Sequence, residues 1–226
     1  MPTAPPLSAP QANNSATLVI VSTLGVLLGI SSINHGVCEI FQGDRPISGH
    51  VIKALGSGYS WTLWIHGSEP AFTLVPNFLV TGILATLIGL VMIVWSIRFI
   101  RRPYGPIVFL LLGVTSFLVG GGMAQVLLFT LNWAAATRIR SSLGFWRYLI
   151  APAIARVLGR LWPWSLVAGV VFFLAASEIA VVGYGPHAPD QAEIVLRNLW
   201  GIGLAIIVSF LLSFVFGFAH DAEARR

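Results

Sequence analysis

The segment between Arg102 and Arg138 constrains the fold most, because it contains no charged residue and is bracketed by arginines. As one helix, residues 106–137 would be about 48 Å long at 1.5 Å per residue. The hydrocarbon core of a bilayer is about 30 Å thick. Arginine-rich segments on both sides should lie on the same side of a membrane, which requires an even number of crossings between them.

Three consecutive glycines, Gly120–Gly122, lie near the middle of this segment. Glycine is unfavourable inside a helix and well suited to a turn. The segment therefore predicts a hairpin of two short helices, 106–120 and 122–137. A re-entrant pair of half-helices and a single long helix are the alternatives.

The composition places the whole chain in a membrane. Of its 226 residues, 56% are hydrophobic and 9% are charged, and the mean hydropathy is +0.85. Soluble domains carry roughly 25% charged residues. The net charge of +5 comes from basic residues clustered between apolar runs. These clusters indicate the cytoplasmic side of a membrane rather than nucleic-acid binding.

Four further apolar runs are long enough to predict spanning helices. They cover residues 16–37, 75–97, 163–183 and 193–218. Gly25 and Gly29 form a GxxxG step, which lets a second helix approach closely. Residues 1–15 lack the basic start of a signal peptide and are expected to be a disordered tail before a retained helix.

The sequence thus predicts an all-α integral membrane protein with six transmembrane helices, or five if the central segment crosses once. All six belong to one transmembrane domain, residues 16–219. Residues 38–73 are expected to form an outer loop, and residues 220–226 a short C-terminal tail. Both termini are predicted to be cytoplasmic, in the inner membrane of a bacterium.

Residues 144–161 have the pattern of an amphipathic helix. Apolar residues including Phe145, Trp146 and Leu149 follow helical spacing, while Arg147, Arg156 and Arg160 share the opposite face. An in-plane membrane helix needs this combination, and its arginines would bind anionic lipid. The alternative is a cytoplasmic helix packed against the bundle.

Several strings resemble those of a group of uncharacterised prokaryotic multi-pass membrane proteins. They are HGVCEIFQG (35–43), EPAFTLVPNFLVTGILA (69–85), LVGGG (118–122) and LWPWS (161–165). In that group prolines follow the glycine run, where this chain has Met123-Ala124-Gln125. The resemblance implies the multi-pass architecture and no particular activity.

A polar or ion site could form on the outer side of this topology. His35 and Glu39 are four residues apart and could share a helix face. His66 and Glu69 follow in the outer loop. Neither an HExxH motif nor a cysteine cluster is present, since Cys38 is the single cysteine, so we expect no metal and no cofactor. Capping and loop hydrogen bonds would also explain these residues.

Glu178 is a carboxylate inside a predicted transmembrane helix, and such a residue suggests a function. Arg197 lies at a similar depth in the next helix, so a structural Glu178–Arg197 ion pair is the competing explanation.

Three hypotheses for the function follow from these features. The first is an accessory, assembly or lipid-interacting membrane protein, possible partners being anionic lipid, a second copy of the chain or another membrane protein. The second is a small transporter or channel subunit with Glu178 as its polar site. The third is a membrane enzyme with an outward-facing site in residues 34–70. The absence of any recognisable catalytic motif favours a protein that is not an enzyme.

Overall fold

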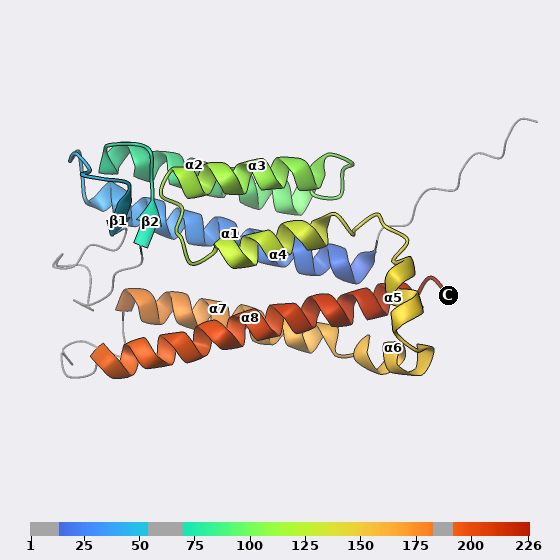
Figure 1. Ribbon diagram of the computed structural model, residues 1–226. Coiled ribbons are helices and arrows are strands. Elements are labelled where there is room, and N and C mark those ends of the chain that lie inside the picture. Colours follow the sequence, from blue (N-terminus) through green and yellow to red (C-terminus); the bar gives the residue numbers. More distant parts are fainter. Residues whose placement is uncertain (1–13, 54–69, 183–191) are drawn as a thin grey trace, which may run out of the picture.

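The computed structural model describes residues 14–53, 70–182 and 192–226, and the chain forms a long helical bundle (Figure 1). A two-stranded antiparallel sheet caps one end. In chain order the elements are α1 (Ser15–Phe41), β1 (Val51–Lys53), β2 (Pro70–Phe72), α2 (Phe78–Arg98), α3 (Gly105–Leu118), α4 (Val126–Ala136), α5 (Gly144–Leu149), α6 (Pro152–Leu158), α7 (Trp162–Val182) and α8 (Ala192–Glu223).

Successive long helices run in opposite directions, so the bundle has two distinct ends (Figure 1). We call the end with β1, β2 and Gly120–Gly122 the glycine end. The opposite end, where α2, α4 and α8 finish and α5 and α6 lie, is the arginine end. Ten arginines occupy it or border it: Arg98, Arg101, Arg102, Arg138, Arg140, Arg147, Arg156, Arg160, Arg225 and Arg226.

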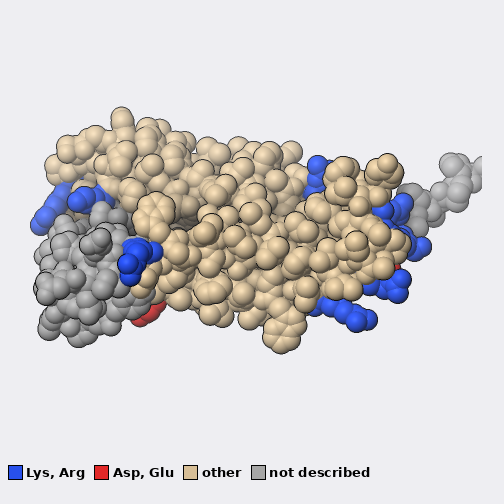
Figure 2. Space-filling model, turned by 60° about the horizontal axis from the view of Figure 1, so that its bottom comes forward, with Lys and Arg blue, Asp and Glu red and all other residues tan. Residues whose placement is uncertain are grey.

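Four stretches of helix are long and apolar enough to cross a bilayer: Ser15–Phe41, Phe78–Arg98, Pro152–Ile179 and Arg197–Glu223. Figure 2 shows lysine and arginine at the two ends of the molecule, with a broad band of uncharged surface between them. Long apolar helices and a charge-free belt are what a bilayer requires. The chain is therefore built as a membrane protein.

The α3–α4 pair leaves the arginine end and returns to it, as the flanking arginines predict (Figure 1). Both helices are apolar but short, with 14 and 11 residues. At 1.5 Å per residue they measure about 21 and 17 Å, less than the roughly 30 Å of a hydrocarbon core. Residues 119–125 lie between them and are not helical.

The single amphipathic helix expected at 144–161 is not formed, because the chain breaks at Ile150 and Ala151 into α5 and α6. Proline has no N–H to donate and disfavours helical geometry in the residue before it. Ala151, which precedes Pro152, is extended, with φ −60° and ψ 145°. In Figure 1, α5 lies across the arginine end and α6 leads back towards α7.

The predicted outer loop, residues 38–73, is more ordered than expected over the part that the structure describes. Helix α1 continues to Phe41, and β1 pairs with β2 in the register Val51–Phe72. Three segments lie outside the described residues: residues 1–13 of the tail predicted over 1–15, residues 54–69 of the outer loop, with His66 and Glu69, and residues 183–191.

Glycines bring α1 and α2 into backbone contact. A Cβ atom on Gly36 would lie 2.5 Å from the carbonyl oxygen of Gly82, and one on Gly29 would lie 2.8 Å from that of Gly89. The predicted close approach at Gly29 is thus present, and the Gly36–Gly82 crossing extends it. Close packing of small residues is a main source of helix association in lipid.

The start of α1 is held by Asp221, a residue of α8 that is 3% exposed. Its carboxylate accepts hydrogen bonds from the backbone N–H groups of Ala16 (3.0 Å) and Thr17 (2.8 Å) and from the Thr17 hydroxyl (2.7 Å). Helix N-termini have unsatisfied N–H groups and a partial positive charge, so a carboxylate stabilises them. This contact exists because α8 continues to Glu223, beyond the predicted end at Phe218.

Replacing Gly36 with alanine should destabilise the protein, whereas the same change at Gly201 should not. The Gly36 methyl group would meet the backbone of α2, but nothing lies within 4 Å of a Cβ on Gly201. We expect Gly36→Ala to lower the free energy of unfolding by about 1–3 kcal/mol. Gly201→Ala should be neutral or stabilising by up to about 1 kcal/mol. Unfolding in detergent measures both, and equal effects would contradict the α1–α2 packing.

Removing the Asp221 carboxylate should loosen the start of α1. Asp221→Ala leaves buried N–H groups without an acceptor and should cost about 2 kcal/mol of unfolding free energy. Glu223→Ala is the control two residues further along α8, because its ion pairs with Arg156 (3.5 Å) and Arg226 (3.4 Å) are partly exposed. Such pairs contribute less than about 1 kcal/mol. A loss at Glu223 as large as that at Asp221 would refute the proposed anchor.

Candidate functional site

The turn formed by Gly120–Gly122, which we call the glycine turn, is fixed in place by residues 70–74. Backbone N–H groups of Gly120 and Met123 donate to the carbonyl oxygens of Phe72 (2.9 Å) and Pro70 (3.1 Å). The N–H of Gly121 donates to Ser116, at the end of α3 (2.8 Å). Gly120 and Gly122 have φ values of +94° and +97°, which favour glycine. The turn is therefore an ordered structure that covers the glycine end.

His35 and Glu39 lie directly beneath the glycine turn. Both belong to the last turns of α1, and their exposed fractions are 4% and 0%. A Cβ on Gly122 would lie 2.6 Å from Nε2 of His35, and one on Gly120 would lie 2.6 Å from Oε2 of Glu39. Both side chains therefore pack against the glycine turn, where the absence of side chains on the glycines leaves room for them.

The Glu39 carboxyl has an unusual environment for a charged residue. Neither of its oxygens has a hydrogen-bond partner among the described residues. By contrast, nearby Ser32 is satisfied by the hydroxyl of Ser116 (3.0 Å) and the carbonyl of Ala85 (3.0 Å). Buried polar groups are normally hydrogen-bonded, and an exception calls for an explanation.

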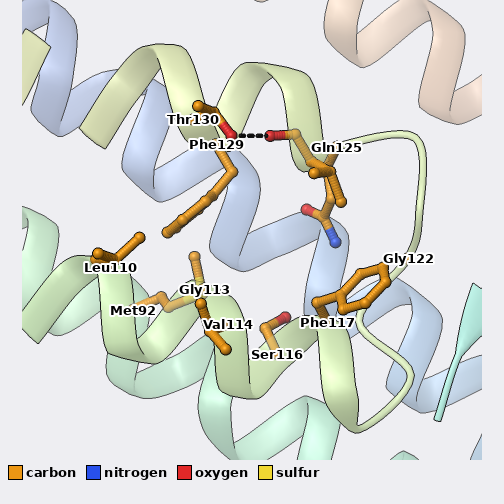
Figure 3. A pocket seen from close by; sticks show the side chains of 11 residues that line it. Met92, Leu110, Gly113, Val114, Ser116, Phe117, Gly122, Gln125, Phe129 and Thr130 are labelled. Carbon is orange, nitrogen blue, oxygen red and sulfur yellow. Dashed lines mark hydrogen bonds between the residues drawn. The ribbon is translucent and has the colours of Figure 1, made fainter. Parts of the chain in front are cut away.

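A cavity of about 190 Å³ lies between α3 and α4, next to the glycine turn (Figure 3). The cavity wall is mainly apolar and includes Met92, Phe117 and Phe129. The side-chain amide of Gln125 points into the cavity (Figure 3). Gly122 lines the cavity on one side and packs against His35 on the other. The backbone of Gly122 therefore lies between the cavity and the buried His35 ring.

The other predicted members of the polar site do not join this pair. Glu178 and Arg197 are both exposed, and no ion pair connects them in the described part of the chain. Glu178 lines neither cavity that we describe here. His66 and Glu69 fall within residues 54–69, outside the described structure. No group of three or more potential metal ligands occurs among the described residues.

The arginine end offers a second kind of surface. Arg147, Arg156 and Arg160 are exposed on α5, α6 and the turn that follows. Large apolar side chains on the same elements are exposed as well, among them Phe145 (68%), Tyr148 (92%) and Val157 (62%). Gly144, Arg147, Tyr148, Arg225 and Arg226 surround a shallow hollow there. This surface combines cationic and apolar side chains, although it is bent rather than one straight helix.

Two structural features are not evident in the sequence. The glycines at 120–122 predict a bend, whereas the turn also covers Glu39. No pattern in α8 indicates that Asp221 reaches the start of α1. Both features depend on contacts between distant residues. The one local indication of the site was the position of the Glu39 carboxylate just after an apolar run.

A comparison of the chain with known protein families, with curated proteins and with solved structures finds no match.

Alanine at Gly122 should be more disruptive than alanine at Gly43, although both glycines have a positive φ. Gly43 has φ +80° and open space around its Cβ position, so alanine adds only backbone strain of about 1–2 kcal/mol. Gly122→Ala adds a collision with the His35 ring, which should cost a further 1–3 kcal/mol or so. Unfolding in detergent gives the difference. Equal losses would mean that His35 does not pack against the turn.

Proposed function

We propose that the protein is an integral membrane protein that binds anionic lipid at its arginine end. The single observation that carries this proposal is the surface of α5 and α6, which exposes Arg147, Arg156 and Arg160 beside bulky apolar side chains. Arginines neutralise lipid phosphates, while apolar side chains enter the boundary between headgroups and acyl chains.

The position of this surface in the bundle supports the proposal. Helix α5 lies across the end of the bundle rather than along it (Figure 1), so in the proposed orientation it would lie at the level of a membrane surface. Arg156 forms one ion pair, with Glu223 at 3.5 Å, and its side chain remains 65% exposed. Its guanidinium is therefore still accessible to a phosphate.

The orientation that we propose follows from the same charge distribution. Ten of the 13 lysines and arginines belong to the arginine end. Basic segments stay in the cytoplasm, so both chain ends would be cytoplasmic, and α3 and α4, although each is shorter than a full span, would be the third and fourth of six membrane helices. Anionic lipids are in the cytoplasmic leaflet, and each basic residue near its surface contributes about 1 kcal/mol to the binding free energy.

The two alternative functions have less support. A transporter or channel using Glu178 would need a polar path, but Glu178 is exposed on α7 and borders neither described cavity. An enzyme in the 34–70 region would need an accessible group of catalytic side chains. His35 and Glu39 are both buried beneath the glycine turn.

Changing Arg147, Arg156 and Arg160 to glutamine should weaken binding of phosphatidylglycerol by about 10- to 100-fold. The variant should keep its weak binding of zwitterionic phosphatidylcholine, because only the charge is lost. Native mass spectrometry of the detergent-solubilised protein, titrated with each lipid, measures both. Wild-type binding of phosphatidylglycerol should also decrease with salt.

The matched control is the triple change of Arg98, Arg101 and Arg102 to glutamine. It removes the same charge from the same end, but from the α2–α3 connection. We expect a smaller loss for this variant. If both variants lose affinity equally, net charge rather than the α5–α6 surface is responsible; if neither does, anionic lipid does not bind there.

A further inference from the structure

Glu39 is a buried carboxyl that takes no part in the proposed lipid binding. It lies at the glycine end, remote from α5 and α6 (Figure 1). Its exposed fraction is 0%, and neither carboxyl oxygen has a hydrogen-bond partner among the described residues. An ionisable residue so placed in a membrane protein is costly to keep and by default marks a function.

Two backbone amides of the turn that covers Glu39 donate to other groups. The glycine turn packs on the carboxyl, with 2.9 Å between its Cδ and a Cβ position on Gly120. The N–H groups of Gly120 and Gly121 donate to Phe72 and Ser116 instead. The turn therefore covers the carboxyl without forming a hydrogen bond to it through these two amides.

The charged groups around Glu39 do not neutralise it with an ion pair in the described part of the chain. His35 and the buried thiol of Cys38 are the other titratable side chains at this end of α1. Asp44, Arg45, His50 and Lys53 follow on the segment that leads to β1, whereas β2, the glycine turn and the adjoining half of α2 contain no titratable residue. Residues 54–69 contain no lysine or arginine, and His66 is their one histidine.

The Glu39 carboxyl has no adjacent cavity, among those described, that could hold a neutralising ion. Neither described cavity is lined by Glu39, and no group of metal ligands occurs among the described residues. An ionised carboxylate without a partner in such surroundings would carry a large desolvation cost. A proton needs no additional space and removes the charge.

We infer that Glu39 is a proton-binding site closed by the glycine turn. The carboxyl holds a proton on one of its oxygens while the turn covers it, and it releases the proton to water when the turn moves away. Because Gly122 also lines the α3–α4 cavity, this movement would change the shape of that cavity. The bound ligand is thus a proton, and the glycine turn controls its exchange.

Infrared spectroscopy of the full-length protein in detergent at neutral pH tests the inference. A protonated carboxylic acid has a carbonyl-stretching band that shifts in D2O. We expect this band in the wild type and its loss in Glu39→Gln, which keeps the size of the side chain but has no acid. Absence of the band from the wild type, or its persistence in Glu39→Gln, would overturn the proposal.

The role of the turn is tested with Gly120→Ala, whose methyl group would push the turn away from the carboxyl. We expect the band to disappear at a lower pH in this variant than in the wild type. An unchanged titration would show that the turn does not control the proton. Gly43→Ala is the control, because its positive-φ glycine lies in open space and should leave the titration unchanged.

If Gly120→Ala does not fold, the pH dependence of thermal stability decides. A proton held only by the folded state makes the wild type lose stability relative to Glu39→Gln as the pH rises. The relative loss should reach at most about 3–5 °C in Tm per pH unit. Parallel profiles for the two proteins would overturn the inference.

Discussion

The enclosure of α1 by the other helices is the constraint on which the rest of the structure depends. In the most apolar 18-residue stretch of α1, 56% of the residues are buried, against 28% in that of α2. Helix α1 contacts α2, α4, α7 and α8. Lipid supplies no hydrophobic force that drives helices together, so close packing must do so. The glycines of α1 meet that need by bringing its backbone against α2, and the other helices then pack around this pair.

Placing α1 at the centre creates a demand for internal hydrogen bonds, because no water reaches its polar groups. Asp221 satisfies its first N–H groups, Asn132 of α4 donates to the carbonyl of Val21 (3.1 Å), and Ser32 bonds to Ser116 of α3. Each contact also ties a different helix to α1. Glu39 stands out against this pattern because neither oxygen of its buried carboxyl has a hydrogen-bond partner among the described residues, which makes it more informative than an exposed carboxylate such as Glu178.

The sequence was sufficient for features that depend on local composition. Apolar length predicted the four long helices, and the arginines at both ends of residues 103–137 predicted the return of the chain. The break before Pro152 was also readable, although helical spacing over 144–161 hid it. By contrast, the pairing of the glycine turn with residues 70–74 and the contact between Asp221 and α1 join distant parts of the chain. No local pattern encodes such contacts, and exposed Glu178 and Arg197 show that equal depth in adjacent helices does not imply an ion pair.

The two ends of the bundle are separated by a closed apolar core. Ile20, Leu24 and Leu28 of α1 and Phe109 of α3 all have an exposed fraction of 0%. The glycine turn, by contrast, lies directly on Glu39. A proton bound at Glu39 would therefore exchange at the glycine end. Any influence on the arginine end would have to pass through a shift of α1, whose start is held by Asp221 of α8.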